Sequence, residues 1–132
     1  MIVEIPGKPQ AKQRPRLGRW GAYTPAPTQA YETKIKSIVR KMGIKPVSGP
    51  ISVEITCEFP IPKSWAKARR AAAEGKPHVC VPDLDNVVKC VLDGLNKVAI
   101  DDDAQVHTIT ARKIRTSDCG EGRTVVKITS DH

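Results

Sequence analysis

Apolar and polar residues alternate along residues 51–59, the most regular pattern in the sequence. The odd positions are apolar and the even positions carry serine, threonine or glutamate, a period of two that is typical of a β-strand with one buried face. The apolar members are Ile51, Val53, Ile55, Cys57 and Phe59. Prolines at positions 60 and 62 end the pattern.

Three shorter patterns predict further strands, over residues 2–5, 105–114 and 124–129. Between the last two, residues 117–122 read Ser-Asp-Cys-Gly-Glu-Gly, and this glycine and aspartate content favours a hairpin turn. We therefore expect the last two strands to form a hairpin.

Apolar residues recur at helical spacing in two other stretches. One follows Thr28, a candidate N-cap, and ends at Gly43; the other covers most of residues 84–97. Residues 64–73 have high helix propensity, with Ser64 as the candidate cap. The two apolar stripes consist of Tyr31, Ile35, Ile38, Val39 and Met42, and of Leu84, Val88, Val91, Leu92 and Leu95. The predicted fold is α+β, one domain over residues 1–132 with a mixed sheet and about three helices.

The stretch between the first strand and the first helix, residues 8–27, is rich in proline, glycine and basic residues. The prolines and glycines prevent a regular helix, so the stretch is either a solvated loop or an arm that follows DNA phosphates. Its basic residues are Lys8, Lys12, Arg14, Arg16 and Arg19, and a second basic cluster on the predicted helix over 64–73 consists of Lys67, Arg69 and Arg70.

Charge divides the chain into three parts. The 132 residues include 22 Lys or Arg and 14 Asp or Glu, a net charge of +8, which favours a polyanion as partner. Residues 1–82 carry a net +10, residues 83–103 a net −4 and residues 104–132 a net +2. Carboxylates repel phosphate unless they hold a cation that the phosphate also contacts, so the acidic stretch predicts a metal-dependent enzyme acting on nucleic acid. With 4% aromatic residues, stacking on many unpaired bases is not the expected binding mode.

The four cysteines form no C-x-x-C pair, and we expect reduced thiols. His78 and Cys80 offer two zinc ligands, but no second close pair follows, so zinc is the weaker alternative. The sequence contains neither a signal-peptide pattern nor an apolar stretch of about 20 residues. We expect a soluble, cytoplasmic protein without membrane association.

Asp83 and Asp85 lie at the start of the predicted helix over 84–97. If the chain is still extended there, the two carboxylates point the same way and can share a Mg²⁺ ion, which prefers oxygen ligands. The alternative is that they only cap the helix and complement its dipole. Lys89 and Asp93 follow at four-residue spacing and share a face with Asp85. Lys89 either stabilises charge on a reacting phosphate or forms an ion pair with a neighbouring aspartate.

Three more aspartates, Asp101, Asp102 and Asp103, follow the same helix, and adjacent carboxylates repel one another unless they are solvated in a turn or share a cation. The helix rises roughly 18 Å from residue 85 to residue 97, and an extended chain from 97 to 103 covers about 20 Å. Asp103 is therefore the best candidate for a third ligand and Asp102 the next, while a turn role stays open for Asp101. If the chain does not return to the helix start, the site must be completed across a subunit interface.

These residues resemble a known motif. Asp83-Leu84-Asp85-Asn86, Lys89, Asp93 and Asp102-Asp103-Ala104-Gln105-Val106 are similar to the D-L-D-N-x-x-K … D … D-D-x-x-V core of the RusA-like Holliday junction resolvases. Pro6-Gly7-Lys8-Pro9 with Lys12, Arg14, Pro15 and Arg16 resembles the family's G-K-P … K-x-R-P-R stretch.

The resemblance implies a small homodimeric α/β protein of bacteria or their phages that cuts four-way DNA junctions with Mg²⁺, for which Mn²⁺ is an expected substitute. It also implies that Asp83, Asp85 and Asp103 are the catalytic, metal-binding carboxylates, that Lys89 is the required lysine and that Asp102 is the neighbouring acid. A two-fold dimer suits this reaction, because one chain carries one acidic stretch and resolution needs two symmetric cuts.

Two other functions stay open from the sequence. One is a metal nuclease that acts on flaps or single strands. The other is a branched-DNA-binding module whose aspartates are purely structural. The variant Asp85→Asn distinguishes an enzyme from a binding module, because it abolishes cleavage in the first case and changes nothing in the second.

Overall fold

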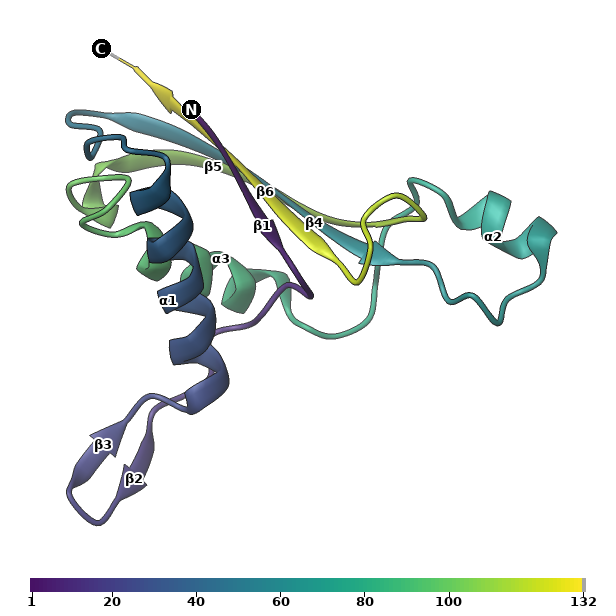
Figure 1. Ribbon diagram of the computed structural model, residues 1–132, viewed down its shortest axis with the longest axis horizontal. Coiled ribbons are helices and arrows are strands. Elements are labelled where there is room, and N and C mark those ends of the chain that lie inside the picture. The colour runs from purple at the N-terminus through teal and green to yellow at the C-terminus, as the bar shows by residue number, and fades with distance from the viewer. Residues whose placement is uncertain (132) are drawn as a thin grey trace.

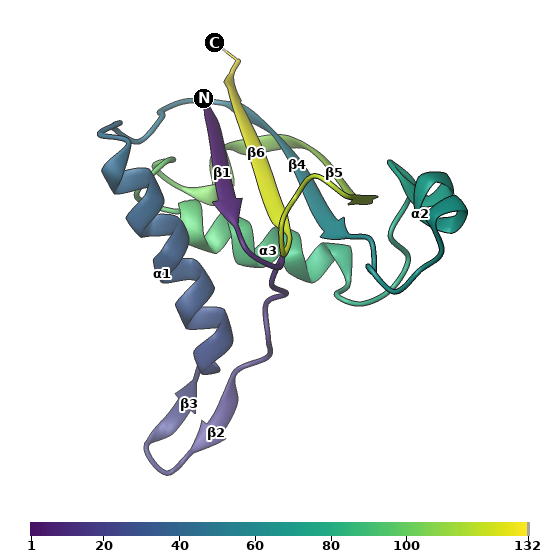
Figure 2. The same ribbon diagram turned by 45° about the vertical axis from the view of Figure 1, so that its right-hand side comes forward.

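The computed structural model describes residues 1–131. Its main sheet contains, in spatial order, β1 (Ile2–Pro6), β6 (Arg123–Ser130), β4 (Ile51–Pro60) and β5 (Val106–Thr116). β6 is antiparallel to both of its neighbours, whereas β5 is parallel to β4. The helices α1 (Ala26–Lys41) and α3 (Leu84–Leu95) lie against one face of this sheet (Figures 1 and 2). The predicted α+β fold with a mixed sheet is confirmed.

The core lies between the sheet and these two helices. The odd positions of β4 are buried, as their alternation predicts, and they form the core with Tyr31, Ile35 and Val39 of α1 and with four residues of α3, Val87, Cys90, Val91 and Leu95. The predicted stripes are correct only in part, because Met42 is exposed and Leu92 is half-buried, whereas Val87 and Cys90 belong to the core. α1 and α3 approach each other closely at Gly94, where a Cβ atom would lie 2.6 Å from Ile35 Cδ1. Any larger residue at 94 would push the helices apart. No helix within residues 1–131 is both long and apolar enough to cross a membrane.

The predicted hairpin between the last two strands is wrong. β5 and β6 are not paired with each other, because β4 lies between them and bonds to both. The parallel pairing of β4 with β5 requires a long crossover, which contains α3 packed on the sheet. The turn composition at 117–122 therefore predicts the reversal correctly but not the partner strand.

Gly122 allows the chain to pass from that turn into β6. Its φ of +135° is one that L side chains rarely adopt, and a Cβ atom there would lie 2.9 Å from the Cα of Lys8. The Gly122 carbonyl also accepts the amide N–H of Gly7 at 2.9 Å. The start of β6 is thereby held against the end of β1.

Neither predicted helix cap is correct. α1 begins earlier than expected, after Pro25, and the second helix, α2 (Lys67–Ala73), begins after Ala66 and not at Ser64. Pro27 favours this earlier start of α1, because a proline in the first helical turn has its φ already set for a helix and brings no amide N–H that needs a partner. Thr28 is instead fully buried inside the first turn, and its Oγ1 accepts the amide N–H of Gln13 at 3.1 Å.

Residues 12–25, called here the N-terminal arm, form more than an irregular loop. The expected absence of a helix is confirmed, but the arm contains a two-stranded hairpin made of β2 (Arg16–Gly18) and β3 (Gly21–Tyr23). Figures 1 and 2 show this hairpin extending beyond the N-terminal end of α1. At another extremity of the molecule, α2 projects from the sheet and contains no buried residue.

Candidate functional site

Asp83 and Asp85 lie at the N-terminal end of α3, and both are exposed. Asp83 precedes the helix in an extended conformation (φ −69°, ψ 133°), and its carboxylate makes no capping hydrogen bond. Its carbonyl oxygen, by contrast, accepts the amide N–H of Val87 at 3.1 Å. Capping therefore does not account for the Asp83 carboxylate, whereas Asp85, in the first turn, lies where a negative charge complements the helix dipole.

A cleft of about 380 Å³ opens beside Asp85. Residues 12–15 of the N-terminal arm line one side, and Asp85, Asn86 and Lys89 line the other. The arm is tied to α3 at this point, because the amide N–H of Lys12 donates to the carbonyl of Asn86 at 2.8 Å. A carboxylate thus shares the cleft with the basic side chains of Arg14 and Lys89, an arrangement that suits a phosphate bound together with a cation.

Lys12, which the sequence predicts as a DNA contact, has its ammonium group engaged within the protein. Its Nζ lies 2.6 Å from Glu32 Oε1 and 2.9 Å from Asp93 Oδ2. Burial lowers its pKa, but the hydrogen bonds and charges of Glu32 and Asp93 outweigh that effect and raise the pKa above the usual 10.5. Lys12 therefore joins the arm to α1 and α3. This role of Glu32 is not predictable from its local pattern, which is that of a solvated helix residue.

Lys89 is exposed on α3 and lines the cleft. Within residues 1–131, the ion pair of Asp93 is with Lys12, and none joins Lys89 to Asp85 or Asp93. The alternative role of Lys89, an ion pair with a neighbouring aspartate, is therefore absent from the described residues. Its charge is available to a group that enters the cleft.

The three consecutive aspartates after α3 differ in their surroundings. Asp101 belongs to a turn, where its carboxylate accepts the Ser48 hydroxyl at 2.7 Å and its amide N–H donates to Val47 at 3.3 Å. Asp102 and Asp103 are exposed and close to each other. A hydrogen bond with Asp102 is the largest cause that raises the pKa of Asp103, followed by slight burial and by the charges of Asp102 and Asp93.

Gln105 fixes this acidic turn to the start of β4. Its Oε1 accepts the amide N–H of Asp102 at 2.7 Å, and its Nε2 donates to the carbonyls of Val47 and Gly49 at 2.9 and 2.7 Å. Asp103 and Gln105 bound a short 3-10 helix that leads into β5. Gln105 is part of the motif, but it carries no charge, and its residue type alone does not predict this anchoring role.

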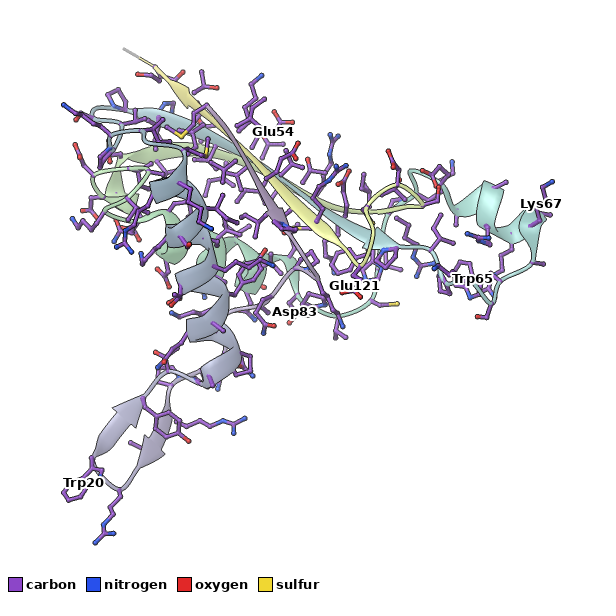
Figure 3. All side chains as sticks on the ribbon, viewed as in Figure 1. Trp20, Glu54, Trp65, Lys67, Asp83 and Glu121 are labelled. Carbon is purple, nitrogen blue, oxygen red and sulfur yellow. The ribbon has the colours of Figure 1, made fainter. Side chains whose placement is uncertain are left out.

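One chain does not assemble the predicted three-carboxylate site. Figures 1 and 2 show the chain leaving α3 at the end opposite Asp83, which Figure 3 labels, and entering β5 there. Asp103 accordingly lies close enough to Asp93 for the charge of Asp93 to raise its pKa. Asp93 itself lies about 12 Å along the helix from Asp85. Among residues 1–131, no three His, Cys, Asp or Glu side chains are placed to hold one metal ion. The return path predicted for Asp103 is not taken within the single chain.

The zinc alternative also lacks a ligand set in the described part of the chain. The His78 ring stacks on Phe59 with centroids 3.9 Å apart, and its Nε2 lies 3.3 Å from the carbonyl of Val81. Burial, together with the charges of Arg115 and Lys113, lowers the pKa of His78 despite that hydrogen bond. All four cysteines are free thiols, as expected.

Lys113 of β5 orients the segment that leads to Asp83. Its Nζ donates to the carbonyls of Cys80 and Pro82, each at 2.7 Å. Two charge-assisted hydrogen bonds to carbonyls only two residues apart, directly before Asp83, restrict where Asp83 can lie. No local pattern predicts this contact, because Lys113 lies 33 positions after Cys80 and 31 after Pro82.

The predicted DNA-binding residues fall at separate places on the surface. Lys8, Arg14, Arg16 and Arg19 are exposed on or near the N-terminal arm. Lys67 and Arg70 line a second cavity, of about 520 Å³, with Glu74, while Arg69 lies over the ring of Trp65 at 3.6 Å. Figure 3 shows Trp20 of the arm and Lys67 of α2 at opposite extremities of the molecule. The cleft beside Asp85 is lined by the arm and not by α2.

Two comparisons with known proteins bear on this site. The family model described as "Endodeoxyribonuclease RusA" matches residues 6–129. The chain is also similar to the "Uncharacterized protein YqaN" of Bacillus subtilis (strain 168), with 27% identity over 116 residues, which cover 81% of this chain and 82% of YqaN. The family match includes the N-terminal arm, α3 and the acidic turn.

Proposed function

Because the chain belongs to the RusA endodeoxyribonuclease family, we propose that it is a Mg²⁺-dependent enzyme that resolves four-way DNA junctions by two symmetric nicks. The observation that carries the proposal is the cleft beside Asp85, where a carboxylate and basic side chains meet at the start of α3. Phosphate bound by the basic groups is repelled by the carboxylate unless a cation lies between them.

The donor set at the start of α3 fits Mg²⁺. Asp83 and Asp85 offer exposed carboxylate oxygens, and that of Asp83 is not used for capping, which leaves room for the waters that Mg²⁺ retains. When bound, Mg²⁺ supplies an activated water for attack on the scissile phosphate and stabilises the leaving oxygen. Arg14 and Lys89 hold that phosphate across the cleft, and Lys89 offsets the negative charge that develops on it.

A second copy of the chain supplies the third carboxylate in this proposal. Asp85 and Asp93 lie four residues on either side of Lys89, so two α3 helices packed antiparallel about a two-fold axis near Lys89 bring the start of one helix to the end of the other. The partner subunit's Asp103 then joins Asp83 and Asp85. The sequence already offers this alternative: if the chain does not return to the start of the helix, the metal site must be completed across a subunit interface.

The first test is cleavage of synthetic four-way junctions, flaps and linear duplexes by the wild type and by Asp85→Asn. We expect junction-selective cleavage that stops in excess EDTA, and a loss of at least about 100-fold in Asp85→Asn with junction binding retained. Asp101→Asn is the matched control, because Asp101 belongs to a turn and not to the cleft. Cleavage in excess EDTA, or by Asp83→Asn and Asp85→Asn proteins, would overturn the metal mechanism, and preference for flaps would replace the junction as substrate.

The second test distinguishes a shared site from a site within one chain. Asp83→Asn and Asp103→Asn proteins are inactive alone and are then mixed and allowed to exchange subunits. In a shared site, the mixed dimer contains one site with both defects and one intact site, so nicking returns. If each site lies within one chain, both sites of the mixed dimer are defective and the mixture stays inactive.

A further inference from the structure

The hairpin of the N-terminal arm has a fixed base and a free tip. At the base, the buried Thr28 Oγ1 accepts the amide N–H of Gln13 and donates to Gln13 Oε1 at 3.2 Å. Gln29 Nε2 also donates to the carbonyl of Thr24 at 2.8 Å. The tip, by contrast, exposes Leu17 at 89% and Trp20 at 92% of their surfaces. The arm is therefore held in one direction while its end is free for contact.

The tip combines an apolar ring with positive charge. Trp20 stands in the turn between β2 and β3, and the guanidinium of Arg19 lies 5.4 Å from the centre of its ring. Below the turn, the Tyr23 ring lies against Gly18, where a Cβ atom would be 3.1 Å from the ring carbons. A fully exposed tryptophan is unfavourable in water, so this exposed tip indicates a surface that is covered in a complex.

The charge of the arm indicates whether DNA or a second copy of the chain covers the tip of the hairpin. Residues 5–31 contain no aspartate or glutamate, and the arm itself carries Arg14, Arg16 and Arg19. Two such arms repel each other, whereas the same groups attract a phosphate backbone. Aromatic side chains beside basic residues are the usual means of stacking on exposed bases.

The arm also has a suitable reach. Arg14 lines the cleft beside Asp85, and Trp20 follows six residues later, which limits their separation to about 20 Å. At about 3.4 Å per nucleotide along a strand, the Trp20 ring lies within about six nucleotides of a phosphate in the cleft. One bound junction can therefore occupy both places at once.

We propose that Trp20 inserts at the branch point of the DNA and stacks on a base-pair face that becomes exposed where the arms of the junction separate. Arg16 and Arg19 contact the phosphates on either side. The inference rests on the proposed function for the identity of the DNA, but stacking requires neither metal nor cleavage. It assigns to the hairpin the recognition of the branch, and to the cleft beside Asp85 the reaction.

Tryptophan fluorescence in excess EDTA tests the proposal, because the chain contains two tryptophans. The variant Trp65→Phe leaves Trp20 as the single emitter, and Trp20→Phe leaves Trp65 as the matched control. We expect a four-way junction to quench Trp20 strongly, a linear duplex of equal length to quench it weakly, and neither to change Trp65. Equal quenching by junction and duplex, or none by either, overturns the proposal. A blue shift of Trp20 emission on raising the protein concentration without DNA overturns it in favour of a second copy.

Binding by Trp20→Ala gives an independent measure. We expect its affinity for the junction to fall about 5- to 150-fold, the range for one stacked base, with affinity for the duplex unchanged and circular dichroism equal to that of the wild type. A parallel loss for both DNAs refutes recognition of the branch. Failure of the proposed function is a separate result. If the wild-type protein binds junctions through Trp20 but cuts none of them, the proposed cleavage is refuted and the role of Trp20 in binding still holds.

Discussion

Two basic segments extend from the sheet and its helices, namely the N-terminal arm and the α2 segment (residues 61–82). They differ in what their basic side chains contact. The arm is tied to α1 and α3 by buried Thr28 and by the two ion pairs of Lys12, and it lines the cleft with Asp85. α2 has no buried residue, and Arg69 lies over Trp65. Similar composition therefore has different consequences, because only the arm places positive charge beside the acidic stretch.

The largest expected effect comes from removing the same number of positive charges from each of the two segments. Arg16→Gln with Arg19→Gln, and Lys67→Gln with Arg69→Gln, each remove two positive charges from exposed positions. We expect the arm variant to reduce junction affinity at least about tenfold at low salt and to lower the slope of log K against log salt by about 2, since each phosphate contact contributes about 0.9.

The α2 variant serves as the control, and we expect it to change affinity less than about threefold. Affinity and slope are measured by titration of labelled junction DNA at several salt concentrations. Equal losses in the two variants contradict the distinction and return Lys67 and Arg69 to the DNA interface that the sequence predicts.

The C-terminal end of the α2 segment leads directly to Asp83, and Lys113 of β5 holds this end in place. Lys113→Met removes the hydrogen bonds to the carbonyls of Cys80 and Pro82 and frees the chain before Asp83. We expect cleavage to fall about tenfold, because small displacements of a reacting group are costly, with a higher Mg²⁺ concentration needed for half-maximal rate. The control is Lys127→Met on β6, which removes the same charge from an exposed position of the sheet. An unchanged Mg²⁺ dependence in Lys113→Met refutes a positioning role.

The anchoring of the arm is measurable as stability. Lys12→Met leaves the half-buried carboxylates of Glu32 and Asp93 without their shared cation, and we expect a loss of about 1–3 kcal/mol in the free energy of unfolding. Because folding raises the pKa of Lys12 above 10.5, the stabilisation is complete below pH 10.5 and disappears as pH rises through the folded-state pKa. Urea denaturation from pH 7 to pH 11 should show the two proteins converging. A constant difference across that range contradicts the ion-pair origin.

Much of this organisation is predictable from the sequence, and the failures have a common cause. β4, α1 and α3 follow from local periodicity, and the acidic motif identifies the candidate site. The predicted hairpin of the last two strands and the predicted Thr28 cap are wrong, and the ion pairs of Lys12 were not predicted, because each of these features is decided by distant residues. Thr28 bonds to Gln13, Lys12 pairs with Glu32 and Asp93, and β4 separates the last two strands. Local propensity has no information on these contacts.

The smallest expected effect concerns the attachment of α2 to the sheet. The Glu74 carboxylate accepts hydrogen bonds from the Thr116 hydroxyl at 2.6 Å and from the amide N–H of Ser117 at 2.9 Å, and these bonds lower the pKa of Glu74 below 4.5. A carboxyl with a lowered folded-state pKa stabilises the protein above the unfolded-state value and loses that contribution as pH falls through the folded-state pKa. Glu74→Gln should therefore reduce the thermal midpoint slightly at pH 7, and the difference should shrink at pH values below 4.5. Because the arm does not contact this pair, junction cleavage at pH 7 should stay at the wild-type rate. A loss of junction affinity in Glu74→Gln as large as that expected for Arg16→Gln with Arg19→Gln would mean that α2 is as close to the DNA as the arm.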